Sequence, residues 1–108
     1  MKRGDLVAAV APGAYGKPRP YLLLQGDAFN ATHDSMTVAP LTSHLVGAPL
    51  FRITVEPSST NGLRSVSQVM VDKLVTLPRG RFGPVIGRLD SEVIHRVNRS
   101  LAVWLGLA

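Results

Sequence analysis

One segment of the sequence combines a cation with a stiff backbone. Arg19 stands between two prolines in Gly16-Lys17-Pro18-Arg19-Pro20, directly before an apolar run that begins at Tyr21. Each proline fixes its own φ and restricts the residue before it, so the backbone around Arg19 has few conformations. A guanidinium held in one place can stabilise a charged transition state electrostatically. The alternative is a solvated arginine at an ordinary turn, because prolines are common in turns.

A second segment ends in two adjacent hydroxyl groups. In Val38-Ala39-Pro40-Leu41-Thr42-Ser43, a strand is expected to end at Pro40, and Thr42 and Ser43 follow it. Hydroxyls at the end of a strand can bind phosphate oxygens. They can also stabilise a turn by bonding to the nearby backbone, and the residues alone leave both interpretations open.

Signatures of many other catalytic sites are missing from the sequence. It contains no cysteine, which excludes disulfides, thiolate metal sites and cysteine nucleophiles. His33, His44 and His95 are far apart and lack the spacing of metal ligands. There is no Gly-x-Ser-x-Gly, no Walker-type or Gly-x-Gly-x-x-Gly phosphate loop, and no local pairing of carboxylates. The sequence therefore predicts neither a metal nor a cofactor.

The balance of charge favours a polyanionic partner. The 108 residues hold 12 Lys and Arg against 7 Asp and Glu, which gives a formal net charge of +5 and a pI near 10.5. Arginine outnumbers lysine, and its planar fork of donors suits phosphate binding and stacking on bases. A strongly basic domain of this size points first to nucleic acid and second to an acidic protein.

No targeting or membrane segment is expected near the start of the chain. The apolar run Leu6–Ala11 follows Asp5 and stops at Pro12. It is shorter than the core of a signal peptide and far shorter than a membrane span of about 20 residues. A cytoplasmic protein is the default expectation.

Short apolar runs separated by turn residues predict a mainly β domain. Glycine and proline punctuate the chain, as at Pro12-Gly13, Gly26-Asp27, Asn61-Gly62 and Arg79-Gly80. Several short strands at this spacing favour a small barrel or sandwich. The expected strands are Leu6–Val10, Tyr21–Gln25, Met36–Ala39, Phe51–Val55, Ser67–Val71 and Val85–Arg88.

The last segment has helical periodicity. Apolar residues recur at spacings of three and four in Ile94, Val97, Leu101 and Trp104. Asp90 or Ser91 can cap the start, and Gly106 suits the C′ position at the end. One amphipathic helix over about Ser91–Leu105 is therefore predicted, with its apolar stripe, including Trp104, packed on the strands.

A series of motifs along the chain resembles the MazF/PemK family of toxins from bacterial type II toxin–antitoxin systems. The resemblance extends from about Lys2 to Leu107, so it covers nearly the whole chain. Each motif is weakly specific alone, but together they stand in the family's order and spacing. They are Lys2–Val7, Gly16–Pro20, Asp27–Asn30, Pro40–Ser43, Asn61–Leu63, Ser67–Val69, Asp72–Leu74, Arg81 and Ile86–Leu89.

The resemblance implies a fold, an activity and partners. The fold would be a single domain over residues 1–108: an SH3-like small β-barrel of the CcdB/PemK/MazF type over about residues 1–89, with the C-terminal helix at about 91–105. The activity would be metal-independent, sequence-specific cleavage of single-stranded RNA, in which the substrate's own 2′-OH attacks the adjacent phosphate and leaves 2′,3′-cyclic phosphate and 5′-OH ends. The protein would be a homodimer, inhibited by an antitoxin whose C-terminal segment occupies the RNA groove.

The resemblance also implies catalytic residues. Arg19 matches the family's arginine in an Arg-Pro pair and would stabilise the phosphorane. Thr42 matches the threonine that follows a strand-end proline and would contact the scissile phosphate. Asp72 matches an acidic position implicated as a base in some members, but a structural carboxylate paired with an arginine is an equal alternative for it.

Further residues are expected to contact RNA. Ser43 would assist Thr42, and Lys17 and Arg81 would contact phosphates. Phe29 could stack a base, although a place in the core is the alternative for an aromatic residue. Asn30, Ser67 and Gln68 complete the expected RNA-binding set.

One departure from the family and two alternative functions remain open. The loop Pro12–Pro18 is compact and holds neither the Glu nor the His that many family members carry there, so no role for such a residue can be transferred. The chain also ends in Trp104-Leu105-Gly106-Leu107-Ala108, which resembles the C-terminus of CcdB-like gyrase poisons on the same fold. A third reading is a non-catalytic SH3-like RNA-binding module, because fold does not prove function.

Overall fold

The structure, a computed structural model, describes residues 1–10, 12 and 16–108. The turn expected at Pro12-Gly13, and much of the loop before Pro18, lie outside the described residues. The described elements are β1 (Asp5–Ala9), β2 (Arg19–Leu23), α1 (Asp27–Asn30), β3 (Ser35–Thr42), β4 (Arg52–Val55), β5 (Ser67–Met70), the 3₁₀ turn η1 (Val71–Lys73), β6 (Val75–Pro78), the 3₁₀ turn η2 (Arg79–Arg81), β7 (Phe82–Arg88) and α2 (Ser91–Trp104).

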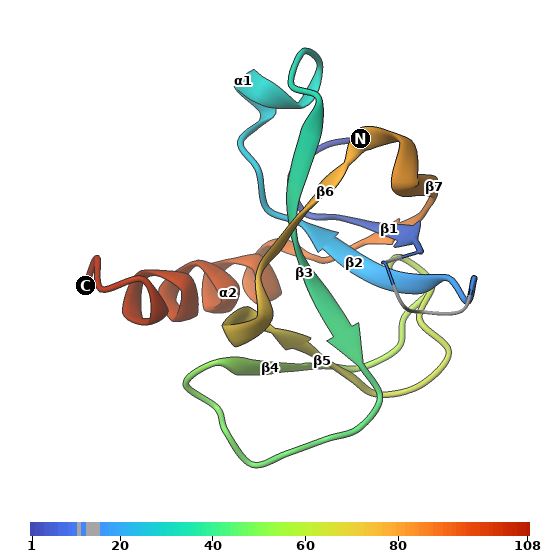
Figure 1. Cartoon of the computed structure of the whole chain (residues 1–108). Helices are drawn as coiled ribbons and strands as arrows, with labels where there is room; N and C mark the ends of the chain where they lie inside the picture. The colour runs from blue at the N-terminus through green and yellow to red at the C-terminus, as the bar shows by residue number, and fades with distance from the viewer. Residues whose placement is uncertain (11, 13–15) are drawn as a thin grey trace.

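The strands form one antiparallel sheet of seven strands in the order β4-β5-β3-β2-β1-β7, with β6 paired to β3 outside this path (Figure 1). β3 is the hub of the sheet. Its first half, Ser35–Val38, pairs with β6, while Val38–Pro40 pairs with β2. Its last two residues pair with β5. The end of β3 therefore lies where β2 and β5 come together.

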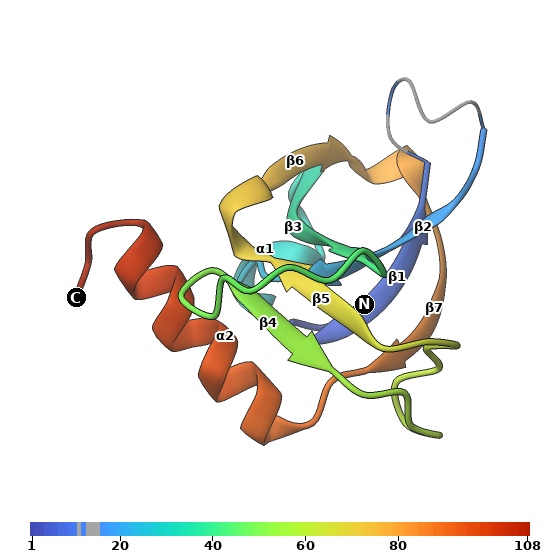
Figure 2. The same ribbon diagram turned by 90° about the horizontal axis from the view of Figure 1, so that it is seen from below.

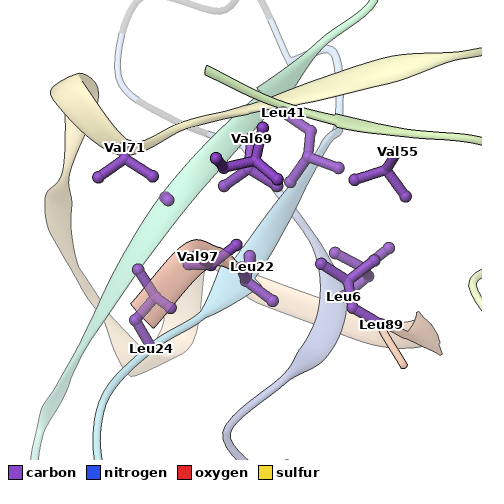
Figure 3. Packing of buried hydrophobic residues seen from close by; sticks show 11 residues of the cluster. Leu6, Leu22, Leu24, Leu41, Val55, Val69, Val71, Leu89 and Val97 are labelled. Carbon is purple, nitrogen blue, oxygen red and sulfur yellow. The ribbon is translucent and has the colours of Figure 1, made fainter. Parts of the chain in front are cut away.

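The apolar residues of β2 are buried on both faces of the sheet. On β2, Leu22 belongs to a cluster with Leu6, Leu41 and Val69 (Figure 3). Its neighbour Leu23 belongs to a second cluster on the other face. Alternate residues of a strand point to opposite faces, so a continuous apolar run fits a strand that is covered on both sides.

α2 covers the larger cluster. Val97 of α2 is fully buried in it, and α2 packs against β4 and η1 (Figure 2). The side chain of Asp90 caps the helix by accepting a hydrogen bond from the backbone N–H of Val93 at 3.2 Å. Gly106 follows the helix with φ +74°, as the C′ position favours. Over the described part of the chain, no helix has the length and apolar character to cross a membrane.

The mainly β fold with a C-terminal helix confirms the architecture expected from the sequence, with specific corrections. β3 continues through Pro40 to Thr42 instead of ending at the proline. Pro40 can lie inside the strand because it stands where the partner on one side of β3 changes from β6 to β5, so a missing N–H there interrupts little pairing. β6 was not anticipated, because its four residues end at a proline and gain their hydrogen bonds only from distant β3.

Trp104 is less buried than its place on the apolar stripe suggests. Its side chain is 49% exposed, and its ring packs on Phe51, with the ring centroids 5.5 Å apart. Its neighbours Val103, Leu105 and Leu107 are also exposed, as is Leu50 beside them at 68%. The C-terminal end of α2 thus carries an apolar surface that this chain alone does not cover.

Candidate functional site

A cleft of about 680 Å³ opens where the start of β2 and the end of β3 face the segment that leads into β5. Its volume lies within the range of sites that hold small ligands, about 300–1,000 Å³. Its walls combine apolar side chains and prolines with hydroxyls and two arginines. The lining residues are Pro18, Arg19, Pro20, Tyr21, Pro40, Leu41, Thr42, Ser43, Gly62, Leu63, Arg64, Ser65, Ser67, Met70 and Ile86.

The pairing of β2 with β3 brings Arg19 and Thr42 together. Tyr21 is the partner of Pro40 in this antiparallel ladder. The ladder leads from this pair toward Arg19 on β2 and Thr42 on β3, which each lie two residues beyond it on their strands. Both side chains line the cleft, and Arg19 is exposed at its mouth. The two segments that the sequence singled out separately therefore form one site.

The hydroxyl oxygen of Thr42 accepts a hydrogen bond within the turn after β3, and the hydroxyl proton remains available for a hydrogen bond to a ligand. Its Oγ1 accepts a hydrogen bond from the backbone N–H of His44 at 3.1 Å. A hydroxyl has one proton to donate as well as its acceptor lone pairs. The turn-stabilising interpretation and the phosphate-contact interpretation are thus compatible, because the bond from His44 orients the oxygen without using its proton.

Residues 56–66, between β4 and β5, form the opposite wall and are tied down by Asn61. Its Oδ1 accepts from the backbone N–H groups of Ser58 and Leu63, both at 3.0 Å, and its Nδ2 donates to the carbonyl of Glu56 at 2.9 Å. Asn61 is buried, so these bonds are shielded from water. One side chain therefore fixes both ends of the turn that carries Gly62 and Leu63 into the cleft.

Two glycines let this turn lie against β7. A Cβ on Gly62, which has φ +69°, would stand 2.3 Å from the carbonyl oxygen of Ile86. A Cβ on Gly87 would stand 2.4 Å from the carbonyl oxygen of Asn61. The backbone N–H of Arg88 donates to the carbonyl of Thr60 at 3.0 Å. The wall is thus built from two backbones in direct contact, which only residues without a side chain allow.

Asp72 lies elsewhere, in an ion pair with Arg52. Its carboxylate accepts from Arg52 Nε at 2.8 Å and from Nη2 at 3.2 Å, and both side chains are largely buried, at 12% and 14% exposed. These hydrogen bonds lower the pKa of Asp72 and raise that of Arg52. Asp72 does not line the cleft, and a lowered pKa weakens a base. The geometry favours the structural alternative for Asp72.

The remaining expected RNA contacts divide into those the structure brings to the cleft and those it does not. Ser43 and Ser67 line it, although the hydroxyl of Ser67 donates to the carbonyl of Ser65. Lys17 and Arg81 are exposed but are not among its lining residues. Phe29 is 60% exposed on α1, so it is not a core residue, and it also lies outside the cleft.

Asn30 and Gln68 are buried and serve the scaffold. Asn30 Nδ2 donates to the carbonyl of Gln25 and to Asp27 Oδ1, which holds α1 in place. Gln68 bonds both the N–H and the carbonyl of Val46, at 3.0 and 2.9 Å, and so fixes the segment after β3. The sequence motif identified these positions, but their side-chain N–H groups already bond the protein itself, which leaves little donor capacity for a ligand. Asn30 Oδ1 is buried with no hydrogen-bond partner among the described residues.

Arg64 is the cleft residue that the sequence did not single out. It is exposed and follows the Asn61–Leu63 motif directly. Its place directly after the Asn61–Leu63 motif is the feature of the sequence that could have identified it. The lining residues described above include no Asp, Glu or His, and no group of three such side chains gathers as metal ligands in the part of the chain that the structure covers. What the cleft offers chemically is positive charge and hydrogen-bond donors.

Comparisons with known proteins show the family of the chain. A family model described as PemK-like, MazF-like toxin of type II toxin-antitoxin system matches residues 2–105. The chain is 48% identical over 109 residues to a Mycolicibacterium smegmatis protein named probable endoribonuclease MazF, across 100% of this chain and 99% of that one.

Solved structures show the same fold. The Mycobacterium tuberculosis toxin MazF-mt6 is 25% identical, with a TM-score of 0.83 over 96% of this chain and 98% of its own. A crystal structure of MazE–MazF from Deinococcus radiodurans is 28% identical, with a TM-score of 0.81 over 100% of this chain and 97% of its own. The cleft formed by Arg19 and Thr42, the fold around it and a family match over residues 2–105 lead to one conclusion: the chain belongs to the PemK-like, MazF-like toxins of type II toxin–antitoxin systems.

Proposed function

We propose that this protein is a toxin that cleaves single-stranded RNA, with Arg19 and Thr42 as its catalytic residues. The observation that carries the proposal is that β2 and β3 bring these two side chains to one cleft in a chain of this family. The relatives support it, because the Mycolicibacterium smegmatis protein is named a probable endoribonuclease.

The chemistry needs no protein nucleophile. The 2′-oxygen of a ribose attacks the adjacent phosphorus, and the bond from phosphorus to the 5′-oxygen of the next nucleotide breaks. The 2′-hydroxyl loses its proton and the leaving 5′-oxygen gains one, which gives a 2′,3′-cyclic phosphate and a 5′-OH. Negative charge builds on the non-bridging oxygens between these events, and fixed donors at that position lower the barrier.

Arg19 and Thr42 supply those donors. The guanidinium of Arg19 can bond two phosphate oxygens at once and stays charged at neutral pH, so it stabilises the phosphorane electrostatically. The proton of Thr42 Oγ1 is free to donate to the same group, because the bond from His44 occupies only a lone pair. Ser43, next to Thr42 in the cleft, is placed to support that contact.

Cleavage of RNA by the purified protein in EDTA tests the proposal. Wild type is expected to cut single-stranded RNA at defined sites, and end analysis should find cyclic phosphates and 5′-hydroxyls. Arg19→Ala should lower kcat by about 10²–10³-fold, the usual effect of losing one transition-state donor, while circular dichroism and urea unfolding stay unchanged. Binding of RNA without turnover would favour the non-catalytic module instead, and undiminished cutting by Arg19→Ala would overturn the site assignment.

A gyrase poison on this fold is the second candidate, based on the C-terminal Trp104. The relatives reported above give it no support, since those named for an activity are endoribonucleases. It predicts trapped gyrase–DNA cleavage complexes that disappear with Trp104→Ala. If the protein is a ribonuclease, no trapped gyrase–DNA complexes are expected. In the structure the ring of Trp104 packs on Phe51.

A cognate antitoxin and a second copy of this chain are the proposed partners. The family consists of toxins from toxin–antitoxin systems, and the Deinococcus structure pairs MazF with MazE. An acidic antitoxin segment in the cleft would meet the positive charge that RNA meets. The exposed apolar residues around Leu50 and the end of α2 are the surface proposed for the homodimer, since patches of this kind mark protein interfaces. The proposed location of all these steps is the bacterial cytoplasm.

A further inference from the structure

We propose that Arg64 is a second phosphate-binding residue of the cleft, which holds a phosphate next to the scissile one and positions the RNA strand on Arg19. The inference deepens the proposed function and rests on it for the identity of the substrate. Arg64 and Arg19 are the two arginines among the cleft's lining residues, and they approach from different elements, the 56–66 segment and β2.

The guanidinium of Arg64 has no acidic partner to neutralise it. The single ion pair found across residues 1–10, 12 and 16–108 joins Arg52 to Asp72. Arg64 also makes none of the side-chain hydrogen bonds that Arg3, Arg52 and Arg79 make in that same part of the molecule. Its charge and its donors are therefore available to an anion that enters the cleft.

The backbone that carries Arg64 is held in place, although its side chain is exposed. Asn61 fixes the turn just before it through three hydrogen bonds, and Gly62 rests on the backbone of β7. On the other side, Ser67 Oγ bonds the carbonyl of Ser65 where β5 begins. A fixed backbone on both sides reduces the conformational freedom that binding must remove.

The other residues that line the cleft suit an RNA nucleotide that lies between two such phosphates. Leu63, Met70 and Ile86 give the cleft apolar surface, while Thr42 and Ser43 give it hydroxyls. A nucleotide placed across the cleft would lay its base on the apolar side chains, with a phosphate at each arginine. Phosphate contacts fix register and orientation without reading sequence, so Arg64 would act on every substrate alike.

Binding of uncleavable RNA tests this role apart from catalysis. The probe is a short single-stranded RNA pool of random sequence with 2′-O-methyl groups, which blocks the attacking hydroxyl. Its Kd is measured by fluorescence anisotropy from low to moderate salt for wild type, Arg64→Ala, Arg64→Gln and Arg64→Lys. Arg88→Ala is the matched control, because Arg88 is an exposed arginine at the end of β7 that lines neither the cleft nor the surface around Leu50.

Arg64→Ala and Arg64→Gln are expected to weaken binding about tenfold at low salt and to reduce the slope of log K against log salt by about 0.7, the value for one phosphate of a single strand. Arg64→Lys should keep the slope. With cleavable RNA, KM should rise while kcat stays within about twofold. Equal losses in Arg64→Ala and Arg88→Ala, or an unchanged salt slope, would overturn the proposal. If wild type binds the probe but never cuts RNA, the proposed activity fails while the Arg64 contact is still measured.

Discussion

Arg19 and Thr42 line one cleft from neighbouring antiparallel strands, each two residues beyond the Tyr21–Pro40 pair in the ladder that joins β2 and β3. The relationship depends on the register of that ladder. A slip of one residue would turn either side chain to the opposite face of the sheet. Leu22 and Leu23, buried in different clusters on the two faces, prevent such a slip. The core thus fixes the geometry of the site.

The hydroxyl of Thr42, and not its shape, is expected to matter for cleavage. Thr42→Val keeps the shape but loses the donor, so we expect kcat to fall by about 10²-fold, whereas Thr42→Ser should retain most activity. Single-turnover cleavage of a fluorogenic RNA measures both. Thr42→Val also loses the bond from His44, so urea unfolding of each variant separates the two effects. Equal activity of Thr42→Val and Thr42→Ser would show that no donor is needed there.

The ion pair of Asp72 with Arg52 is expected to make stability depend on pH on the acid side. Hydrogen bonds from Arg52 lower the pKa of Asp72 in the folded state, so the ionised carboxylate stabilises the fold. That stabilisation is present above the unfolded pKa of about 3.9 and is lost as the pH falls through the lower folded value.

Asp72→Asn should therefore unfold with about 1–3 kcal/mol less free energy at pH 6 and should lose less than wild type between pH 5 and 2. Urea unfolding across this range gives both quantities. Its RNA cleavage should stay close to that of wild type once the protein is folded, because Asp72 lies outside the cleft. If Asp72→Asn loses RNA cleavage while its free energy of unfolding is unchanged, Asp72 is a catalytic residue and not a structural one.

Gly87 is expected to be required for the wall of the cleft. In Gly87→Ala the new methyl group would meet the backbone of Asn61 and Thr60 at 2.4–2.6 Å, and backbone cannot move aside cheaply. We expect a loss of about 1–3 kcal/mol in the free energy of unfolding and a higher KM, since the displaced segment carries Leu63 and Arg64. Gly80→Ala is the control, because nothing lies within 4 Å of its Cβ position. Equal behaviour of the two variants would contradict this packing.

The apolar surface at the end of α2 is expected to join two copies of the chain. Leu50→Asp places a charge in that surface and should raise the dissociation constant of the dimer at least tenfold, because a buried unpaired charge is costly. Sedimentation equilibrium measures it. Phe29→Asp is the matched control, since Phe29 is similarly exposed on α1. The prediction fails if both variants assemble like wild type, or if wild type is a monomer throughout.

The sequence by itself determined the class of fold and the outline of the site. The apolar run Tyr21–Gln25 predicts a strand, and the stripe through Ile94, Val97 and Leu101 predicts the helix that packs on the strands. These features depend on neighbours a few residues away, so periodicity reveals them. The motifs around Arg19 and Thr42 were equally visible as single segments.

Only the tertiary structure decided which of these residues share a site. Asp72, Asn30 and Gln68 stand in motifs, but Arg52 bonds the carboxylate of Asp72, and the side-chain N–H groups of Asn30 and Gln68 bond backbone carbonyls. Arg64 stands in no motif, yet it lines the cleft. The turn just before it, which contains Gly62, packs against the backbone of β7. β6 likewise exists because β3 pairs with it. Each depends on contacts between residues far apart in the chain, and local sequence patterns carry no information about such contacts.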